Sequence, residues 1–200
     1  AEVTFNPKLT TYLYDAQGRV LARLYKENRD QVSLTEIPEH LQKAVIAVED
    51  DRFYTHYGIN FRGIARALLV NLRARDIRQG GSTLTQQLAK NAFLTHERTI
   101  SRKLRELLWA VQIERRYSKD EILEAYLNEV CFGHGAYGVE AAAQLYFGKH
   151  VSDIDLSEAA FLAGVINGPN VFSPFVDKEA AVRRRNFVLS RMQNLNYITP

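Results

Sequence analysis

Apolar residues recur at helical spacing along most of this 200-residue chain, and this pattern limits the fold more than any other feature. Residues three or four positions apart lie on one face of a helix, so each run forms an apolar stripe. The stripes after Pro38 are Leu41, Ala44, Val45 and Val48; Ile64, Leu68, Leu69 and Leu72; and Leu104, Leu107, Leu108 and Val111. Such stripes pack against other elements, so we expect a mainly α-helical domain.

Capping residues and breakers predict where the helices begin and end. A Ser or Asp followed three residues later by Glu predicts a capping box, and the two instances are Ser118 with Glu121 and Asp155 with Glu158. Gly80-Gly81 breaks the chain before Ser82, which is the expected N-cap of the next helix. The first expected helix ends near Glu49. Three further helices are expected from Ser82 to about Asn91, from about Ile100 to Arg116, and from about Lys178 to Asn194.

Three segments are expected to be non-helical. Thr10 to Tyr25 reads as a β-hairpin around the turn Asp15 to Gly18, and gives the domain a small N-terminal β element. A bent connection is marked by Gly133, Gly135 and Gly138, and an irregular loop is bounded by Pro169 and Pro174.

Charge is distributed unevenly along the chain. The net charge is +3, yet Asn60 to Arg105 holds ten Lys or Arg and two acids, so this stretch is +8 and the remainder is −5. Such asymmetry indicates an anionic partner: phosphate, nucleic acid or an anionic membrane surface. No apolar run reaches the ~18 residues of a membrane-spanning helix. Cys131 is the single cysteine, which excludes an intrachain disulfide.

Three adjacent acids, Glu49, Asp50 and Asp51, follow the first apolar helix and precede Phe53 and His56. Acids at a helix C-terminus oppose its dipole, at a cost of ~0.3–1 kcal/mol each. A sequence that breaks a local rule often does so at a functional site. A solvated acidic turn has the same composition, so this cluster alone does not define a site.

The helix expected after Gly80-Gly81 has one polar face. Its members are Thr83, Gln87, Lys90 and Asn91, at i, i+4, i+7 and i+8. Neutral hydrogen-bonding groups beside a lysine suit sugar hydroxyls and phosphate, and the glycines leave backbone N–H groups free to bind an anion. An ordinary amphipathic helix with a flexible lead would show the same spacing.

Arg102, Lys103 and Glu106 share a face of the following helix. Alone they read as a surface salt-bridge ladder. Together with Glu49 they suggest glycosyl transfer, in which one carboxylate activates the attacking hydroxyl and cations stabilise a diphosphate leaving group. Paired carboxylates would instead indicate a glycoside hydrolase.

Five ordered stretches resemble the signatures of the peptidoglycan glycosyltransferase family, family 51, which forms the polymerising domain of class A penicillin-binding proteins. They are Glu49–Gly58, Gly80–Asn91, Arg102–Glu106, Ile122–Asn128 with Gly133 and Gly138, and Leu162–Gly164 through Pro169-Asn170 and Ser173-Pro174. The resemblance covers roughly Tyr12 to Met192, which is nearly the whole chain.

The resemblance implies a lysozyme-like, two-lobed helical fold. Residues 1–200 would form one domain, with a large lobe and a smaller membrane-proximal lobe around 60–100. Members of the family usually have an N-terminal membrane anchor and often a transpeptidase domain, and neither is found in this chain. The family works at the outer, periplasmic face of the bacterial cytoplasmic membrane.

The resemblance also implies the reaction, a processive and inverting polymerisation of lipid II. Glu49 would be the general base on the 4-hydroxyl of the incoming lipid II, and the growing lipid-linked strand would be the donor. Glu106 would support the departing undecaprenyl diphosphate, directly or through Mg²⁺ or Mn²⁺, although the sequence requires no cofactor. Lys90, Arg102 and Lys103 would neutralise the diphosphate. The cleft would be shaped by Asp50, Phe53, His56, Thr83, Gln87 and Asn91.

The expected partners are lipid II, the growing glycan strand, the membrane and a phosphoglycolipid inhibitor such as moenomycin. The Arg-rich segment carrying Ile64, Leu68, Leu69 and Leu72 would contact the bilayer interface, or alternatively form a plain core helix. Two rival functions stay open. A lytic hydrolase on the same scaffold would cut mature glycan, and a non-enzymatic binder would give Glu49 no role. We expect no nucleic-acid partner.

Overall fold

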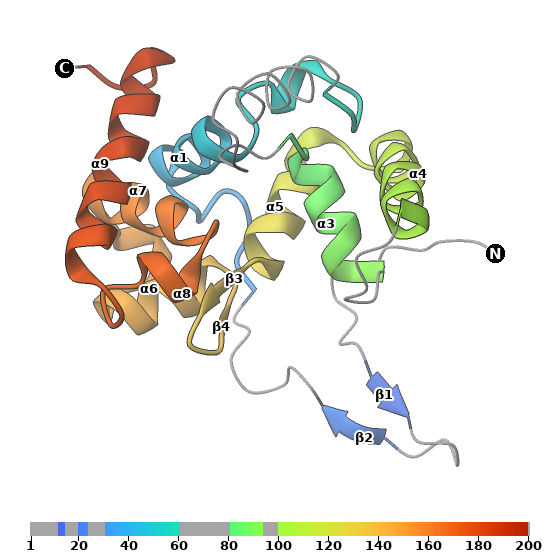
Figure 1. Cartoon of the computed structure of the whole chain (residues 1–200), viewed down its shortest axis with the longest axis horizontal. Helices are drawn as coiled ribbons and strands as arrows, with labels where there is room; N and C mark the ends of the chain where they lie inside the picture. Colours follow the sequence, from blue (N-terminus) through green and yellow to red (C-terminus); the bar gives the residue numbers. More distant parts are fainter. Residues whose placement is uncertain (1–11, 15–19, 24–30, 61–80, 94–99, 200) are drawn as a thin grey trace.

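The computed structural model describes residues 12–14, 20–23, 31–60, 81–93 and 100–199, and this part of the chain is mainly helical (Figure 1). Its α-helices are α1 (Glu39–Glu49), α3 (Leu84–Phe93), α4 (Ile100–Arg116), α5 (Lys119–Glu129), α6 (Val139–Phe147), α7 (Leu156–Val165), α8 (Pro169–Phe172) and α9 (Lys178–Asn194). The predicted mainly α fold class is confirmed, and so are the predicted bounds of α4 and α9. The proposed division into two lobes stays a prediction, because most of residues 60–100 lie outside the described ranges.

Two small antiparallel strand pairs accompany the helices. Strands β1 (Tyr12–Tyr14) and β2 (Val20–Arg23) form the predicted N-terminal hairpin, in which Tyr12 pairs with Arg23. The predicted turn between them is not among the described residues. Strands β3 (Cys131–Gly133) and β4 (Ala136–Tyr137) form a tight hairpin between α5 and α6, where the bent connection was expected.

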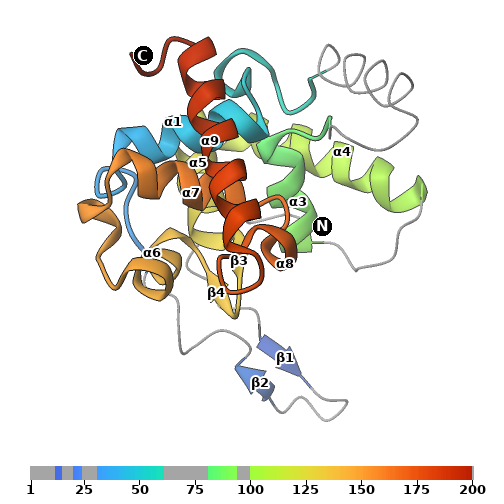
Figure 2. The ribbon, with the colours of Figure 1, turned by 60° about the vertical axis from the view of Figure 1, so that its left-hand side comes forward.

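The helices pack around one apolar core. Helix α7 packs against α9 and α1, while α3 packs against α4 and α5 (Figures 1 and 2). On α1, Leu41, Ala44 and Val45 are buried as their spacing predicted, and Val48 is half-buried. This arrangement sets the C-terminal end of α1 between the α3–α4 pair and α9, and the candidate site forms there.

The N-cap of α3 differs from the prediction by one residue. Helix α3 begins at Leu84, and Thr83 rather than Ser82 caps it. The Gln86 N–H donates to Thr83 Oγ1 at 3.1 Å, while the Thr83 N–H donates to Gln86 Oε1 at 2.8 Å. These reciprocal bonds make a capping box, which leaves the Ser82 hydroxyl facing the cavity. The capping boxes predicted for α5 and α7 are confirmed.

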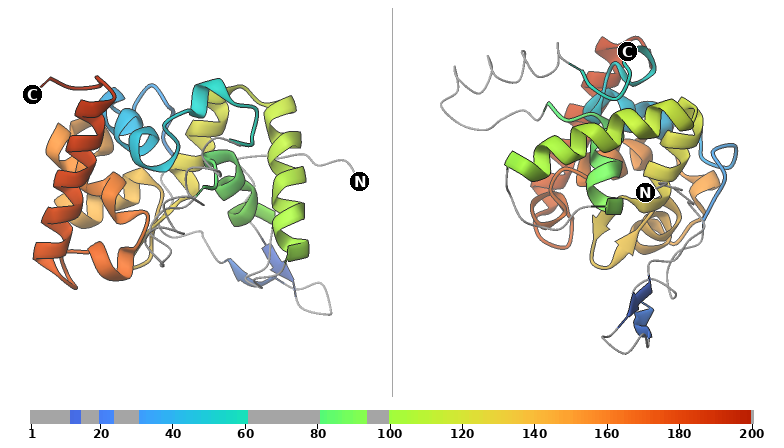
Figure 3. Two further views of the ribbon diagram at one scale, coloured as in Figure 1. Left: turned by 45° about the horizontal axis from the view of Figure 1, so that its top comes forward. Right: turned by 90° about the vertical axis from the view of Figure 1, so that its right-hand side faces the viewer.

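The apolar stripe predicted for α4 is wrong. Leu104 and Leu108 are 57% and 65% exposed, and the buried face of this helix carries Glu106, Ala110 and Ile113 instead. Helix α4 lies at the edge of the molecule (Figure 3). It packs on α3 with a face that must also present polar groups to the cavity. The segment carrying Ile64, Leu68, Leu69 and Leu72 lies outside the described residues, so its predicted role is not addressed by the structure.

The loop between Pro169 and Pro174 is more regular than expected, because it contains the short helix α8. Gly133 lies directly against this helix. A Cβ at position 133, where φ is +84°, would come within 2.6 Å of the Pro169 Cβ. The glycine therefore permits the close approach of β3 to α8.

Two glycines of the β3–β4 hairpin give a matched stability prediction. Gly138 has φ +85° and a Cβ there would lie 2.7 Å from the Asn128 backbone oxygen, whereas Gly135 has φ +79° with no atom within 4 Å of such a Cβ. Gly135→Ala is therefore expected to lower the free energy of unfolding by about 1–2 kcal/mol, from backbone strain alone. Gly138→Ala is expected to lower it by clearly more, because the clash with backbone is added. Equal losses in chemical denaturation would contradict the role of the contact.

Candidate active site

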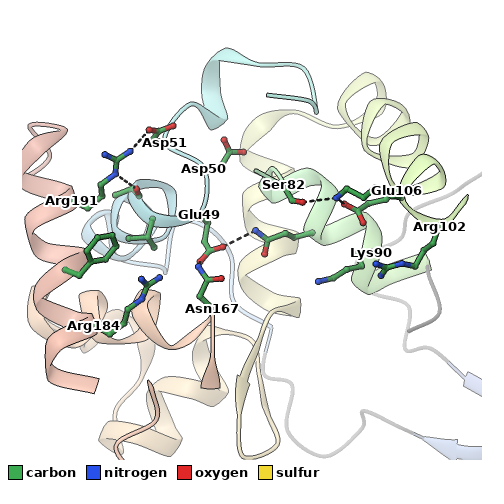
Figure 4. Close-up of a pocket in the computed structure, with 15 residues that line it drawn as sticks. Glu49, Asp50, Asp51, Ser82, Lys90, Arg102, Glu106, Asn167, Arg184 and Arg191 are labelled. Carbon is green, nitrogen blue, oxygen red and sulfur yellow. Dashed lines mark hydrogen bonds and ion pairs between the residues drawn. The ribbon is translucent and has the colours of Figure 1, made fainter. Parts of the chain in front are cut away.

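A cavity of about 400 Å³ opens where the end of α1 faces α3, α4 and α9 (Figure 4). Its lining is largely charged or polar. The lining residues are Ala47, Val48, Glu49, Asp50, Asp51, Ser82, Gln87, Lys90, Arg102, Lys103, Glu106, Asn167, Arg184, Phe187 and Arg191. Residues from four separate signature stretches therefore meet in one cavity, which brings Glu49, Lys90 and Arg102 together as the sequence predicts.

The Glu49 carboxylate is held between two amide groups. Gln87 Nε2 donates to Glu49 Oε2 at 3.0 Å, and Asn167 Nδ2 donates to Glu49 Oε1 at 3.1 Å. Each oxygen keeps lone-pair capacity for one more donor, because a carboxylate oxygen can accept two hydrogen bonds. The arrangement fixes the orientation of the carboxylate and leaves it able to accept a hydrogen bond from a substrate hydroxyl.

A buried tyrosine sets the orientation of Gln87. Tyr126, from the centre of α5, is 1% exposed and donates its hydroxyl hydrogen to Gln87 Oε1 at 3.2 Å. Burial raises the pKa of Tyr126 well above its ordinary value, and the charges of Glu49 and Asp50 raise it further, so the phenol stays a donor. With its oxygen engaged, the Gln87 amide must direct its NH₂ group to Glu49.

Burial also raises the pKa of Glu49 above its ordinary value of 4.5. The hydrogen bond from Gln87 opposes this rise, as do the positive charges of Arg184 and Lys90, while the charge of Asp50 adds to it. A carboxyl whose pKa lies nearer neutrality is a stronger base once ionised, which suits a general base.

The α3–α4 side of the cavity is basic. Lys90 and Arg102 point into it from α3 and α4 (Figure 4). Lys103 Nζ donates to Ser82 Oγ at 2.8 Å and forms an ion pair with Glu106, whose side chain is almost fully buried. Cations and hydroxyl groups that converge in this way are typical of sites for phosphate groups.

The α9 side carries residues that we had not singled out from the sequence. Arg184 and Arg191 come from α9 and Asn167 from the turn after α7 (Figure 4). Arg191 holds the end of α1, because its Nε donates to the Ala47 oxygen at 3.2 Å and its Nη2 lies 2.5 Å from Asp51 Oδ2. Asn167 lies inside the fifth signature stretch, and that position was the available signal for it.

Of three further predicted cleft residues, Asp50 lines the cavity, whereas His56 and Thr83 do not. Asp50 Oδ2 accepts the N–H of Leu84, the first residue of α3, at 3.1 Å and contacts His56 Nε2 at 2.7 Å. Thr83 is buried and donates its hydroxyl hydrogen to the Gly58 oxygen at 2.7 Å. These contacts join the end of α1 to the start of α3, so the three residues position the site, His56 and Thr83 from outside the cavity.

Phe53 and Asn91 also differ from the expectation that they shape the cleft. Phe53 is fully buried, with the Lys119 ammonium 4.6 Å from its ring centre. Asn91 is exposed and does not line the cavity. Of the predicted polar face on α3, Gln87 and Lys90 therefore reach the cavity.

Glu106 is the candidate metal ligand among the described residues. No group of three or more His, Cys, Asp or Glu side chains there converges on a common point. Mg²⁺ bound to a diphosphate commonly uses only one or two protein carboxylates, with the phosphates and water as its other ligands. Glu106 fits that requirement, if it exchanges its contact with Lys103 for the ion.

A mainly helical domain that sets one half-buried glutamate against a basic wall has the features of a glycosyltransferase. The family described as Transglycosylase matches residues 17–193. The chain belongs to this family, the peptidoglycan glycosyltransferase domain of class A penicillin-binding proteins.

Several penicillin-binding proteins match nearly the whole of this chain in sequence. Penicillin-binding protein 1A of Aquifex aeolicus is 51% identical over 98% of this chain and 27% of its own length. Penicillin-binding protein 1F of Bacillus subtilis is 46% identical over 94% of this chain and 26% of its own length. Penicillin-binding protein 1A of Escherichia coli is 49% identical over 94% of this chain and 22% of its own length. The chain thus spans about a quarter of the length of these relatives.

The crystal structure of penicillin-binding protein 1A from Haemophilus influenzae has a similar fold. It superimposes with a TM-score of 0.52 at 27% identity, covering 93% of this chain and 18% of that one. Within the described ranges of the present chain, no helix is both long and apolar enough to cross a bilayer.

Proposed function

We propose that this domain polymerises lipid II into β-1,4-linked glycan strands, with inversion at the anomeric carbon and release of undecaprenyl diphosphate. The observation that supports it best is the shared cavity, in which Glu49 lies opposite Lys90, Arg102 and Lys103. Family membership supports the coarser activity, peptidoglycan glycosyl transfer.

In the proposed reaction, the lipid-linked strand is the donor and a new lipid II is the acceptor. The Glu49 carboxylate takes the proton of the acceptor 4-hydroxyl as that oxygen bonds to the donor anomeric carbon. The bond from this carbon to the diphosphate oxygen breaks at the same time, and its electron pair leaves with the diphosphate. Attack from the opposite face inverts the anomeric centre.

The basic wall stabilises the leaving group in this scheme. Lys90, Arg102 and Lys103 neutralise the charge that develops on the diphosphate oxygen, so no proton donor is needed there. Glu106 keeps Lys103 directed towards Ser82 and the cavity. A Mg²⁺ or Mn²⁺ ion held by Glu106 would supply further neutralisation of the diphosphate.

The domain is proposed to act at the outer face of the bacterial cytoplasmic membrane, where a lipid-anchored substrate must be met. Exposed Leu104 and Leu108, one turn apart on α4 and beside exposed Arg105, support contact with an anionic bilayer. A phosphoglycolipid such as moenomycin would compete for the same basic wall, because it presents a phosphate beside sugars.

The test supplies the purified domain with labelled lipid II in vesicles containing anionic lipid. We expect long glycan strands to accumulate and the domain to float with the vesicles, which checks the activity and the membrane location together. Shortening of mature glycan without polymer formation would instead identify a lytic hydrolase. Failure to float alongside normal polymerisation would remove the membrane contact from the proposal.

A further inference from the structure

The fifth signature stretch, residues 162–174, has only one contact with Glu49 in the scheme above, yet several of its groups converge on Arg184. A Cβ at Gly164 would lie 3.0 Å from Arg184 Cγ, so the absent side chain makes room for the arginine stem. The Gly164 oxygen accepts the Arg184 Nε–H at 3.4 Å. The guanidinium lies 5.2 Å from the ring centre of Phe172 and 4.9 Å from that of Phe187. The Arg184 side chain is therefore held in one position by Gly164 and the two phenylalanine rings.

Arg184 differs from its neighbours in how its charge is used. Arg191 is paired with Asp51, and Arg183 is paired with Glu179 on the surface. In the part of the chain that the structure describes, Arg184 has no carboxylate within ion-pair distance. Its charge acts across the cavity on Glu49, where it favours the ionised carboxylate, and burial lowers the pKa of Arg184 itself.

The other charges around Glu49 come from every surrounding helix. Asp50, directly after α1, disfavours the ionisation of Glu49, Lys90 on α3 favours it, and Tyr126 on α5 is an uncharged donor to Gln87. Farther round the cavity, Arg102 and the Lys103–Glu106 pair belong to the basic wall, and Arg191 is paired with Asp51. Arg184 and Lys90 are thus the cations whose charges stabilise ionised Glu49.

These two cations are not equivalent once substrate is bound. A diphosphate against Lys90 offsets the charge of that lysine and brings negative charge towards Glu49, which favours protonation of the base. Arg184 comes from the opposite side of the cavity, where its charge remains available. The base therefore needs Arg184 most when the donor is in place.

We propose that Arg184 is a positioning residue whose charge keeps Glu49 ionised while the donor diphosphate fills the basic wall, and that residues 162–174 serve to seat it. This inference rests on the proposed function, in which Glu49 is the base. It assigns the fifth signature to the activation of the acceptor hydroxyl and not to the leaving group.

The direct test titrates the Glu49 carboxyl in the intact domain by ¹³C NMR, with Glu49→Gln identifying its signal. Arg184→Met, which keeps an apolar stem between the rings, is expected to move the titration midpoint to higher pH. Inorganic pyrophosphate is expected to move it further in Arg184→Met than in the unsubstituted domain. Arg183→Met is the control and should titrate like the unsubstituted domain. An unchanged midpoint in folded Arg184→Met would overturn the inference.

Kinetics separate this role from a structural one. The acidic limb of the pH profile of kcat/KM is expected to move to higher pH in Arg184→Met. Activity below the limb should fall about tenfold for each pH unit that the limb moves, and it should recover at high pH. Arg184→Lys retains the positive charge, so its acidic limb should lie close to the pH found for the unsubstituted domain. A uniform loss at every pH, or weaker pyrophosphate binding, would contradict the inference. The NMR titration does not depend on catalytic turnover, so it tests the effect of Arg184 on Glu49 separately from the proposed function. An active Glu49→Gln variant would contradict the proposed function but would not decide that effect.

Discussion

Glu49→Gln is expected to lower the rate of lipid II polymerisation by about 10²–10⁴-fold, the range that a positioned general base contributes. The amide cannot take the proton of the acceptor hydroxyl, although its shape fits between Gln87 and Asn167. Substrate binding should persist, because the basic wall is unchanged. The loss should therefore appear in kcat and much less in KM.

The fold should tolerate this substitution. Burial raises the pKa of Glu49 in the folded state, so the ionised side chain disfavours folding at pH values where the unfolded chain would ionise it. Removing the charge is not expected to lower the melting temperature. Glu39→Gln, in the exposed first turn of the same helix, is the matched control and should polymerise normally. Near-normal turnover by Glu49→Gln would remove this residue from the mechanism.

Lys90→Met is expected to lower kcat by about 10²-fold, since removing one preorganised charge-stabilising donor from an active site typically costs 10²–10³-fold. Lys90 is exposed at the cavity and its charge reaches Glu49. Without it, the diphosphate leaves with less neutralisation. Steady-state polymerisation with labelled lipid II and pyrophosphate affinity by calorimetry would measure both consequences.

Lys178→Met provides the comparison, because Lys178 is also an exposed lysine but begins α9 and does not line this cavity. Both variants should melt like the unsubstituted domain. If Lys90→Met bound pyrophosphate as tightly as Lys178→Met and retained its rate, the α3–α4 wall would not be the site of the diphosphate.

The predictions from periodicity succeeded where one helix face meets the main core. Leu41, Ala44 and Val45 on α1 are buried, and the capping spacings placed the starts of α5 and α7. On α4 the same reasoning failed, because this edge helix turns Glu106 inward and leaves Leu104 and Leu108 exposed. Spacing identifies an apolar stripe, but it does not say which side of a helix faces its neighbours.

Among the site residues, the sequence identified those carried by recognisable stretches and missed those whose role depends on tertiary packing. Arg184 lies in a run of three arginines, and only its position three residues after Ala181 and four before Val188, both buried, distinguishes it from Arg183. Asp50 lies beside Glu49 in sequence, yet it points to the start of α3 because the chain turns at the end of α1.

The most direct measurement is a crystal structure of the Glu49→Gln variant with a lipid-diphosphate disaccharide trapped in the cavity. The account predicts that the phosphates lie against Lys90, Arg102 and Lys103, with the anomeric carbon between them and residue 49. Phosphates bound against Arg184, or on a surface that the Glu49 position does not face, would contradict it.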